Sequence, residues 1–353
     1  MPSLSTTGLR HLTKALPPSA RAIPRFRNPV RVPSWAGLLV MICPMLLSTV
    51  SQAAGYPERP VTIVVPFAAG GASDVLGRQI GKQLEGALGQ NFVVDNRTGA
   101  GGTVGAASAA RAAPDGYTLV MGTNASHAIA ATIHRSLRYD PLKDFVPITL
   151  VAHVPQVLMV HPSLPVSNVQ ELIAFARKNP GKLNFSSAGN GTPGHLGMEL
   201  FKMMTQVDMM HVPFQGGNPA LLALTGGQVQ VLADNVNSAL PMIKAGKVKA
   251  IAVTSAKRSG ALPELPTIAE QGVPGFDSGS WFALFEPTLT PTALVSRLNN
   301  EVIKALDNPS VRAALAAQGA EPAAGTPEAL TQLVRADMAK WGGVVKQIGL
   351  TAD

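Results

Sequence analysis

VTIVVPFAAGGASD is the sequence of residues 61–74, and it combines a strand, a turn and the start of a helix. All five residues from Val61 to Val65 are β-branched, which is typical of a strand that packs within a sheet. Gly70 and Gly71 follow and permit a turn in which the backbone N–H groups stay accessible. From about Ser73 to Leu88 the apolar residues recur at helical spacing. The segment therefore predicts a strand–turn–helix unit of an α/β fold.

The same unit recurs along the chain. Residues 92–94 lead through the glycines of 99–105 into an Ala-rich helix, and residues 117–121 are the next expected strand. Further strands are expected at residues 183–186, 209–214, 229–233 and 248–254. This βαβα order predicts parallel sheets flanked by helices.

Two extended apolar stretches interrupt the repeats. Residues 145–161 contain Pro147 and Pro155, so we expect an extended connection there rather than one central strand. Residues 281–285 form a second such stretch, and helices are expected near residues 291–306 and 327–348.

These interruptions predict two lobes. The first is expected to be discontinuous, with residues 54–152 and 278–353, and the second to comprise residues 153–277. Ligands of open α/β sheets bind beyond the carboxyl ends of the strands, so a cleft between the lobes is the expected site.

The basic balance of the chain is concentrated at its start. Its 353 residues carry a formal charge of +8, but no acid precedes residue 54. Six bases lie in that leader: Arg10, Lys14, Arg21, Arg25, Arg27 and Arg31. The rest of the chain is close to neutral, so we expect no nucleic-acid partner.

The first 53 residues are typical of a secretory signal peptide. The leader is followed by an uncharged apolar run at residues 35–50 and then by Ser51-Gln52-Ala53, which suits cleavage after Ala53. A transmembrane anchor is the alternative, but the run is shorter than the roughly 20 residues that a span requires. Cleavage would also remove Cys43, the only cysteine, so disulfides and Cys-ligated zinc are excluded from the mature chain.

Two Gly-rich loops are candidates for anion binding. Residues 66–74 and residues 186–195 each lie between a strand and a helix, and neither contains Lys or Arg. Accessible N–H groups at a helix N-terminus favour an anion. A purely structural role as tight turns, with Ser73 or Asp74 as a helix N-cap, is the alternative for either loop alone.

Other chemistry has weaker support. Gly189, Gly191 and Gly194 match G-x-G-x-x-G, but no acid ends the next strand, so a dinucleotide site is disfavoured. The seven histidines have no paired metal spacing, and we expect neither a metal nor another cofactor. Ser187 with His195 could serve a hydrolase, yet no G-x-S-x-G motif occurs, and His127 and His195 are expected to be loop or capping groups.

Several short motifs together resemble one family over nearly the whole mature chain. The motifs are PFAAGGASD (66–74), GAGG (99–102), SAGNGTPGHL (187–196), HVPFQGG (211–217), LPTIAE (265–270), PGF (274–276) and WFALFEP (281–287). They resemble the Bug family, the substrate-binding proteins of tripartite tricarboxylate transporters.

The resemblance implies a two-lobed periplasmic-binding-protein fold, type II-like, with a mostly parallel sheet in each lobe and a ligand cleft between them. It implies a monomeric periplasmic protein that captures a small carboxylate for the inner-membrane permease subunits of such a transporter, without catalysis. The ligand would be a di- or tricarboxylate, an aromatic carboxylate or an acidic amino acid. The alternatives are a secreted hydrolase using Ser187 and His195, and a ligand sensor for a signalling receptor.

The resemblance also implies which residues hold the ligand. By position these are Phe67, Ala69, Gly70, Asp74, Thr123, Ser126, Ser187, Gly189, Asn190, Gly191, Thr192 and His195, with Phe214, Gly216 and Asp234 as outer candidates. Asp74 would either cap its helix or contact the ligand. The chain departs from the family at Phe214-Gln215, where Tyr and a basic residue are frequent, and at Glu286, where a small residue is common.

Overall fold

The computed structural model describes residues 55–351, so the predicted signal peptide lies outside the described residues. Its first elements are β1 (Val61–Val65), α2 (Ala72–Leu88), β2 (Phe92–Asn96), η1 (Ala100–Gly102), α3 (Thr103–Ala110), β3 (Thr118–Thr123), η2 (Ala125–Ile129) and α4 (Ala130–Ile133). The expected strand–turn–helix units are present here, because β1 pairs in parallel with both β2 and β3.

A second set of units follows the long strand β4 (Phe145–Val160). Its elements are α5 (Val169–Lys178), β5 (Asn184–Ser187), α6 (Pro193–Thr205), β6 (Met210–Pro213), α7 (Gly217–Thr225), β7 (Val231–Asn235), α8 (Val236–Lys244) and β8 (Lys249–Val253). Strand β5 pairs in parallel with β6 and β7, which repeats the arrangement of the first set.

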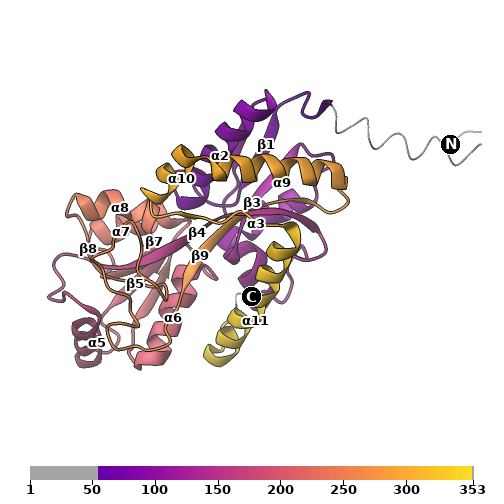
Figure 1. The fold of residues 1–353 in the computed structure, drawn as a ribbon. Helices are drawn as coiled ribbons and strands as arrows, with labels where there is room; N and C mark the ends of the chain where they lie inside the picture. Colours follow the sequence, from indigo (N-terminus) through magenta and orange to yellow (C-terminus); the bar gives the residue numbers. More distant parts are fainter. Residues whose placement is uncertain (1–54, 352–353) are drawn as a thin grey trace, which may run out of the picture. The chain divides into compact units, whose positions relative to one another are not determined.

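The chain then returns to the first set. The last elements are β9 (Gly279–Pro287), α9 (Thr292–Asp307), α10 (Pro309–Ala316), β10 (Glu321–Pro322) and α11 (Pro327–Ile348). Figure 1 shows β4 and β9 running between the β1–β3 group and the β5–β8 group. The strand order is β2-β1-β3-β9-β4-β7-β5-β6, with β8 and β10 also paired to β4.

The expectation that residues 145–161 form a connection rather than a central strand was wrong. Strand β4 is central, and it pairs antiparallel with β9 along its first part and with β7 and β8 along its last part. Proline is tolerated in a ladder where the pairing is irregular or ends. Pro147 lies at a register shift opposite β9, and Pro155 faces Gly279, the first residue of β9.

The core is divided between the two groups of strands. Leu294, Leu298 and Val302 of α9 pack with Ile63 of β1 and Leu76 of α2 in one cluster. Separate clusters fill the space around β5 and β7. The described residues nevertheless belong to one compact unit, and the lobe boundaries drawn from the sequence stay a prediction.

Candidate ligand-binding site

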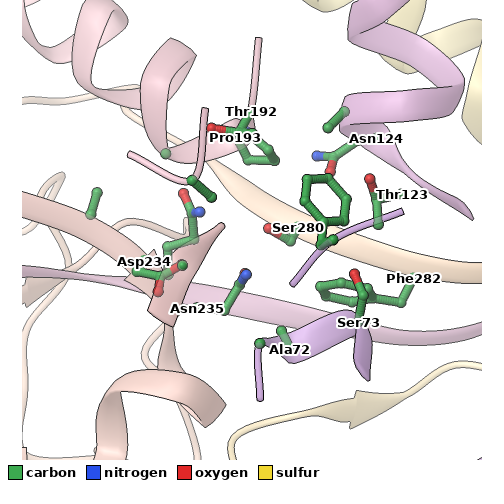
Figure 2. Close-up of a pocket in the computed structure, with 18 of the residues that line it drawn as sticks. Ala72, Ser73, Thr123, Asn124, Thr192, Pro193, Asp234, Asn235, Ser280 and Phe282 are labelled. Atoms are coloured by element: carbon green, nitrogen blue, oxygen red, sulfur yellow. The ribbon is translucent and has the colours of Figure 1, made fainter. Parts of the chain in front are cut away.

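A pocket lies where the loops of the two strand groups meet (Figure 2). Strands β4 and β9 form part of its wall. Its lining comprises Phe67, Ala68, Gly71, Ala72, Ser73, Thr123, Asn124, Ala125, Gln156, Ala188, Thr192, Pro193, Gly194, Gly217, Ala233, Asp234, Asn235, Ser280 and Phe282.

Three helix N-termini contribute to this lining. The N-caps are Gly71 for α2, Thr192 for α6 and Gly216 for α7, and none of the three helices has a hydrogen bond from its N-cap side chain. The first-turn N–H groups of a helix lack intrahelical partners and carry partial positive charge. Among the described residues that line the pocket there is no Lys or Arg. The pocket can thus attract an anion through backbone dipoles alone.

Asp74 is bound within its own loop rather than in the pocket. Its Oδ2 accepts the Gly70 N–H at 3.0 Å, and its Oδ1 pairs with Arg78 at 2.9 Å. Neither Ser73 nor Asp74 is the N-cap that the structural alternative suggested, because Gly71 holds that position. Burial raises the pKa of Asp74, but hydrogen bonds from Arg78 and Gly70 outweigh it and hold the pKa below its usual range.

Asp234 is the one ionisable side chain among the described residues that line the pocket. It is the penultimate residue of β7, it is 4% exposed, and its Oδ2 accepts a hydrogen bond from the Ser238 hydroxyl at 3.1 Å. Gly217, at the start of α7, leaves no room for a side chain, since an added Cβ would lie 2.6 Å from Oδ2. Burial raises the pKa of Asp234 to about 6, against lowering hydrogen bonds from Asn235 and Ser238.

Three amide side chains bring acceptor oxygens to the pocket. Asn124 donates its amide N–H to the Gly279 carbonyl at 2.8 Å, while its Oδ1 is buried without a partner among the described residues. The side-chain oxygens of Gln156 and Asn235 are likewise buried and unpartnered there. Figure 2 shows Thr123 and Asn124 on the side of the pocket opposite Asp234 and Asn235. Buried polar atoms without partners indicate places where a ligand or water completes the hydrogen bonding.

Ser187 is directed away from the pocket and toward an imidazole that the sequence analysis did not select. Its Oγ lies 2.7 Å from His211 Nε2, whereas His195 Nδ1 accepts the Gly191 N–H at 3.1 Å. The expected capping role of His195 is therefore present, but its pairing with Ser187 is not. The two imidazoles stack with centroids 3.8 Å apart, and burial lowers the pKa of His195 to about 3 and that of His211 to about 4.

His127 is a core residue rather than the expected loop or capping group. It lies in the π-helical turn η2, is 0% exposed, and stacks on Phe285 with centroids 4.1 Å apart. Its Nδ1 is 2.9 Å from the Ser126 hydroxyl, which itself accepts the Thr123 N–H. Ser126 and His127 thus support the end of β3 from behind the pocket wall.

The structure brings some predicted site residues into the pocket and places others behind it. Phe67, Thr123, Thr192 and Asp234 line it. The remaining predicted residues do not line it: Ala69, Gly70, Asp74, Ser126, Ser187, Gly189, Asn190, Gly191, His195, Phe214 and Gly216. Several of these shape the loops, as Gly70 and Ser187 do. Their contact with a ligand stays a prediction.

The sequence analysis missed several polar lining residues. Asn124 and Asn235 directly follow Thr123 and Asp234, so their positions at strand ends were a usable signal. Gln156 and Ser280 gave none, because they lie in β4 and β9, which read as apolar extended stretches.

Neither a membrane-spanning helix nor a metal-binding cluster occurs among the described residues. None of their helices is long and apolar enough to cross a membrane. No three His, Cys, Asp or Glu side chains among residues 55–351 cluster closely enough to hold a metal ion.

Comparisons with known proteins agree on one family. Residues 76–350 match the model of the tripartite tricarboxylate transporter family receptor. Protein BugT of Bordetella pertussis is 37% identical over 295 residues, which is 83% of this chain and 90% of that protein. The structure of Rpa4515 from R. palustris with adipate is 42% identical, covers 84% of this chain and 99% of its own, and has a TM-score of 0.82. MatC from Rhodopseudomonas palustris with bound malate is 38% identical, covers 82% of this chain and 100% of its own, and has a TM-score of 0.77.

Proposed function

The chain belongs to the tripartite tricarboxylate transporter receptor family, as its motifs predicted, and we propose that it is a solute-binding protein that captures a small carboxylate between its two lobes. The observation that carries this proposal is the pocket itself. Three helix N-termini lie at a cavity that holds no Lys or Arg among its described lining residues. Backbone dipoles bind an anion without the desolvation that a buried base would require.

The ligands of similar proteins support the same class. Rpa4515 was solved with adipate and MatC with malate, and both are dicarboxylates. Phe67 and Thr192 stand where two separate loops meet the pocket, so one carboxylate could contact both loops at once.

Delivery to a permease and location in the periplasm belong to this proposal. The signal peptide predicted for residues 1–53 would export the chain, and inner-membrane subunits of a tripartite transporter would receive the ligand. We further propose that the protein is a monomer and that it performs no catalysis. Intact-mass measurement of the exported protein tests the first step, and a mature form that retains Cys43 would contradict cleavage after Ala53.

The test of ligand class is a titration panel. Mass spectrometry of small molecules that co-purify with the protein identifies candidates, and calorimetry with succinate, adipate, citrate, benzoate and glutamate ranks them. Binding to the folded state alone stabilises by about 2.7 kcal/mol when the ligand is a hundredfold above its Kd, so a clear rise in Tm is expected. Failure of every carboxylate to bind would overturn the proposal.

The hydrolase alternative gains no support from the pocket. Ser187 is 0% exposed, and its hydroxyl is shared among His211 Nε2 and the backbone of Gly189. A nucleophile must reach its substrate, and this hydroxyl does not line the cavity. Hydrolysis of an ester by the parent protein, lost in Ser187→Ala, would reinstate the enzyme.

A further inference from the structure

The pocket that we propose binds a carboxylate contains a buried carboxylic side chain of its own, that of Asp234. Asp234 precedes Asn235, the last residue of β7, and both residues line the cavity. Asn235 and its strand partner Gln156, with Asn124 on the opposite side of the pocket, add acceptor oxygens that have no partner among the described residues. A fully ionised, unsubstituted dicarboxylate offers only acceptors. Such a ligand cannot donate a hydrogen bond to these oxygens, and its charge would repel an ionised Asp234.

The pocket offers a ligand backbone donors from helix N-termini and a side-chain acceptor in Asp234. The N-termini of α2 and α6 bring N–H groups through Gly71 and Thr192. Asp234 and Asn235 lie at the end of β7, and Figure 2 shows them apart from Thr123 and Ser73. A ligand that fits both regions has a carboxylate for the helix N-termini and a hydrogen-bond donor for the end of β7.

We propose that Asp234 is a specificity-determining residue that accepts a hydrogen bond from a hydroxyl or ammonium group of the ligand. The inference rests on the proposed function and names its substrate class: a hydroxy- or amino-substituted carboxylate is preferred over the unsubstituted acid of the same length. Ser238 supports this role, because its hydroxyl bonds Oδ2 and holds the carboxylate in place from the first turn of α8.

The experiment compares matched ligands by calorimetry at pH 7.5. Succinate is compared with malate and aspartate, and glutarate with 2-hydroxyglutarate and glutamate. We expect the substituted member of at least one series to bind tenfold or more tightly, which corresponds to about 1.4 kcal/mol. Asp234→Ala should abolish that preference. Asp234→Asn distinguishes a hydroxyl donor on the ligand from an ammonium donor. The amide oxygen of Asn still accepts a hydrogen bond from a hydroxyl, but it no longer compensates the charge of an ammonium.

The controls distinguish a failure of the proposed function from a failure of the role assigned to Asp234. Asp208→Asn removes an exposed carboxylate outside the pocket and should change no affinity. If no ligand binds the parent protein, the proposed function fails. If carboxylates bind but each substituted acid binds no better than its unsubstituted partner, only the role of Asp234 is overturned, and this comparison needs no variant to fold. A preference that persists in folded Asp234→Ala would also overturn it.

Discussion

Gly101 lies against the backbone carbonyl of Asn190, so that a methyl group at position 101 would overlap that oxygen. The two residues come from loops that follow β2 and β5, which belong to the two separate groups of strands. Ala68 and Gly216 form a second such contact, where an added Cβ would lie 3.1 Å from the Ala68 side chain. The loops on both sides of the pocket therefore meet through glycines.

Gly101→Ala is expected to weaken ligand binding by holding these loops apart. The backbone there has φ of +64°, so the substitution should also cost about 1 kcal/mol of unfolding free energy through strain. Gly246→Ala is a matched control, because it has the same φ of +64° and nothing within 4 Å of the added Cβ. Calorimetry should find weaker binding only in Gly101→Ala, and equal affinities would show that the contact does not matter for closure.

Asp74→Ala is expected to destabilise the first Gly-rich loop. The change removes the acceptor of the Gly70 N–H and the partner of Arg78, and a hydrogen bond to a charged group contributes roughly 1.5–3 kcal/mol. Asp74→Asn should lose less unfolding free energy, since its amide oxygen can still accept a hydrogen bond from the Gly70 N–H. Urea denaturation measures both. The carboxylate has a lowered folded pKa, so its contribution is present above the unfolded pKa and is lost as the pH falls through the folded one.

Glu286 should make the protein less stable as the pH rises. It is 0% exposed in β9, and its carboxyl oxygens have no hydrogen-bond partner among the described residues. Burial, followed by the charge of Asp115, raises its pKa to about 8. Between the ordinary pKa of a glutamate side chain and a pH of about 8, the folded state binds more protons than the unfolded state. The free energy of unfolding therefore falls as the pH rises through this range. Glu286→Gln should flatten this slope in Tm between pH 5 and 8, and an unchanged slope would exclude Glu286 as its source.

The stacked imidazoles of His195 and His211 should make the protein less stable as the pH falls. His195 and His211 have folded pKa values of about 3 and about 4, so the unfolded state binds more protons as the pH falls from about 6.5. Their stabilising contribution is present above that pH and is lost toward pH 4. His211→Gln should make the acid branch of the Tm profile shallower. Identical acid branches in parent and His211→Gln would contradict this assignment.

The fold was largely predictable because its units are local. The β-branched run at residues 61–65, the glycines at 70 and 71 and the helical spacing after them are each consequences of short-range sterics and periodicity. The resemblance to the Bug family, which rests on short contiguous motifs, was confirmed. Proline misled the reading of β4, because tertiary pairing can place proline where a ladder shifts register.

By itself, then, the sequence determined the βαβα order, the two Gly-rich loops without Lys or Arg, and the family. Only the tertiary structure decided that Ser187 meets His211 rather than His195, and that Gln156 and Ser280 reach the pocket from β4 and β9. These relationships join residues far apart in the chain. Local propensity carries no information about which of several buried polar groups will meet, because that choice depends on how strands pair and how helices pack across them.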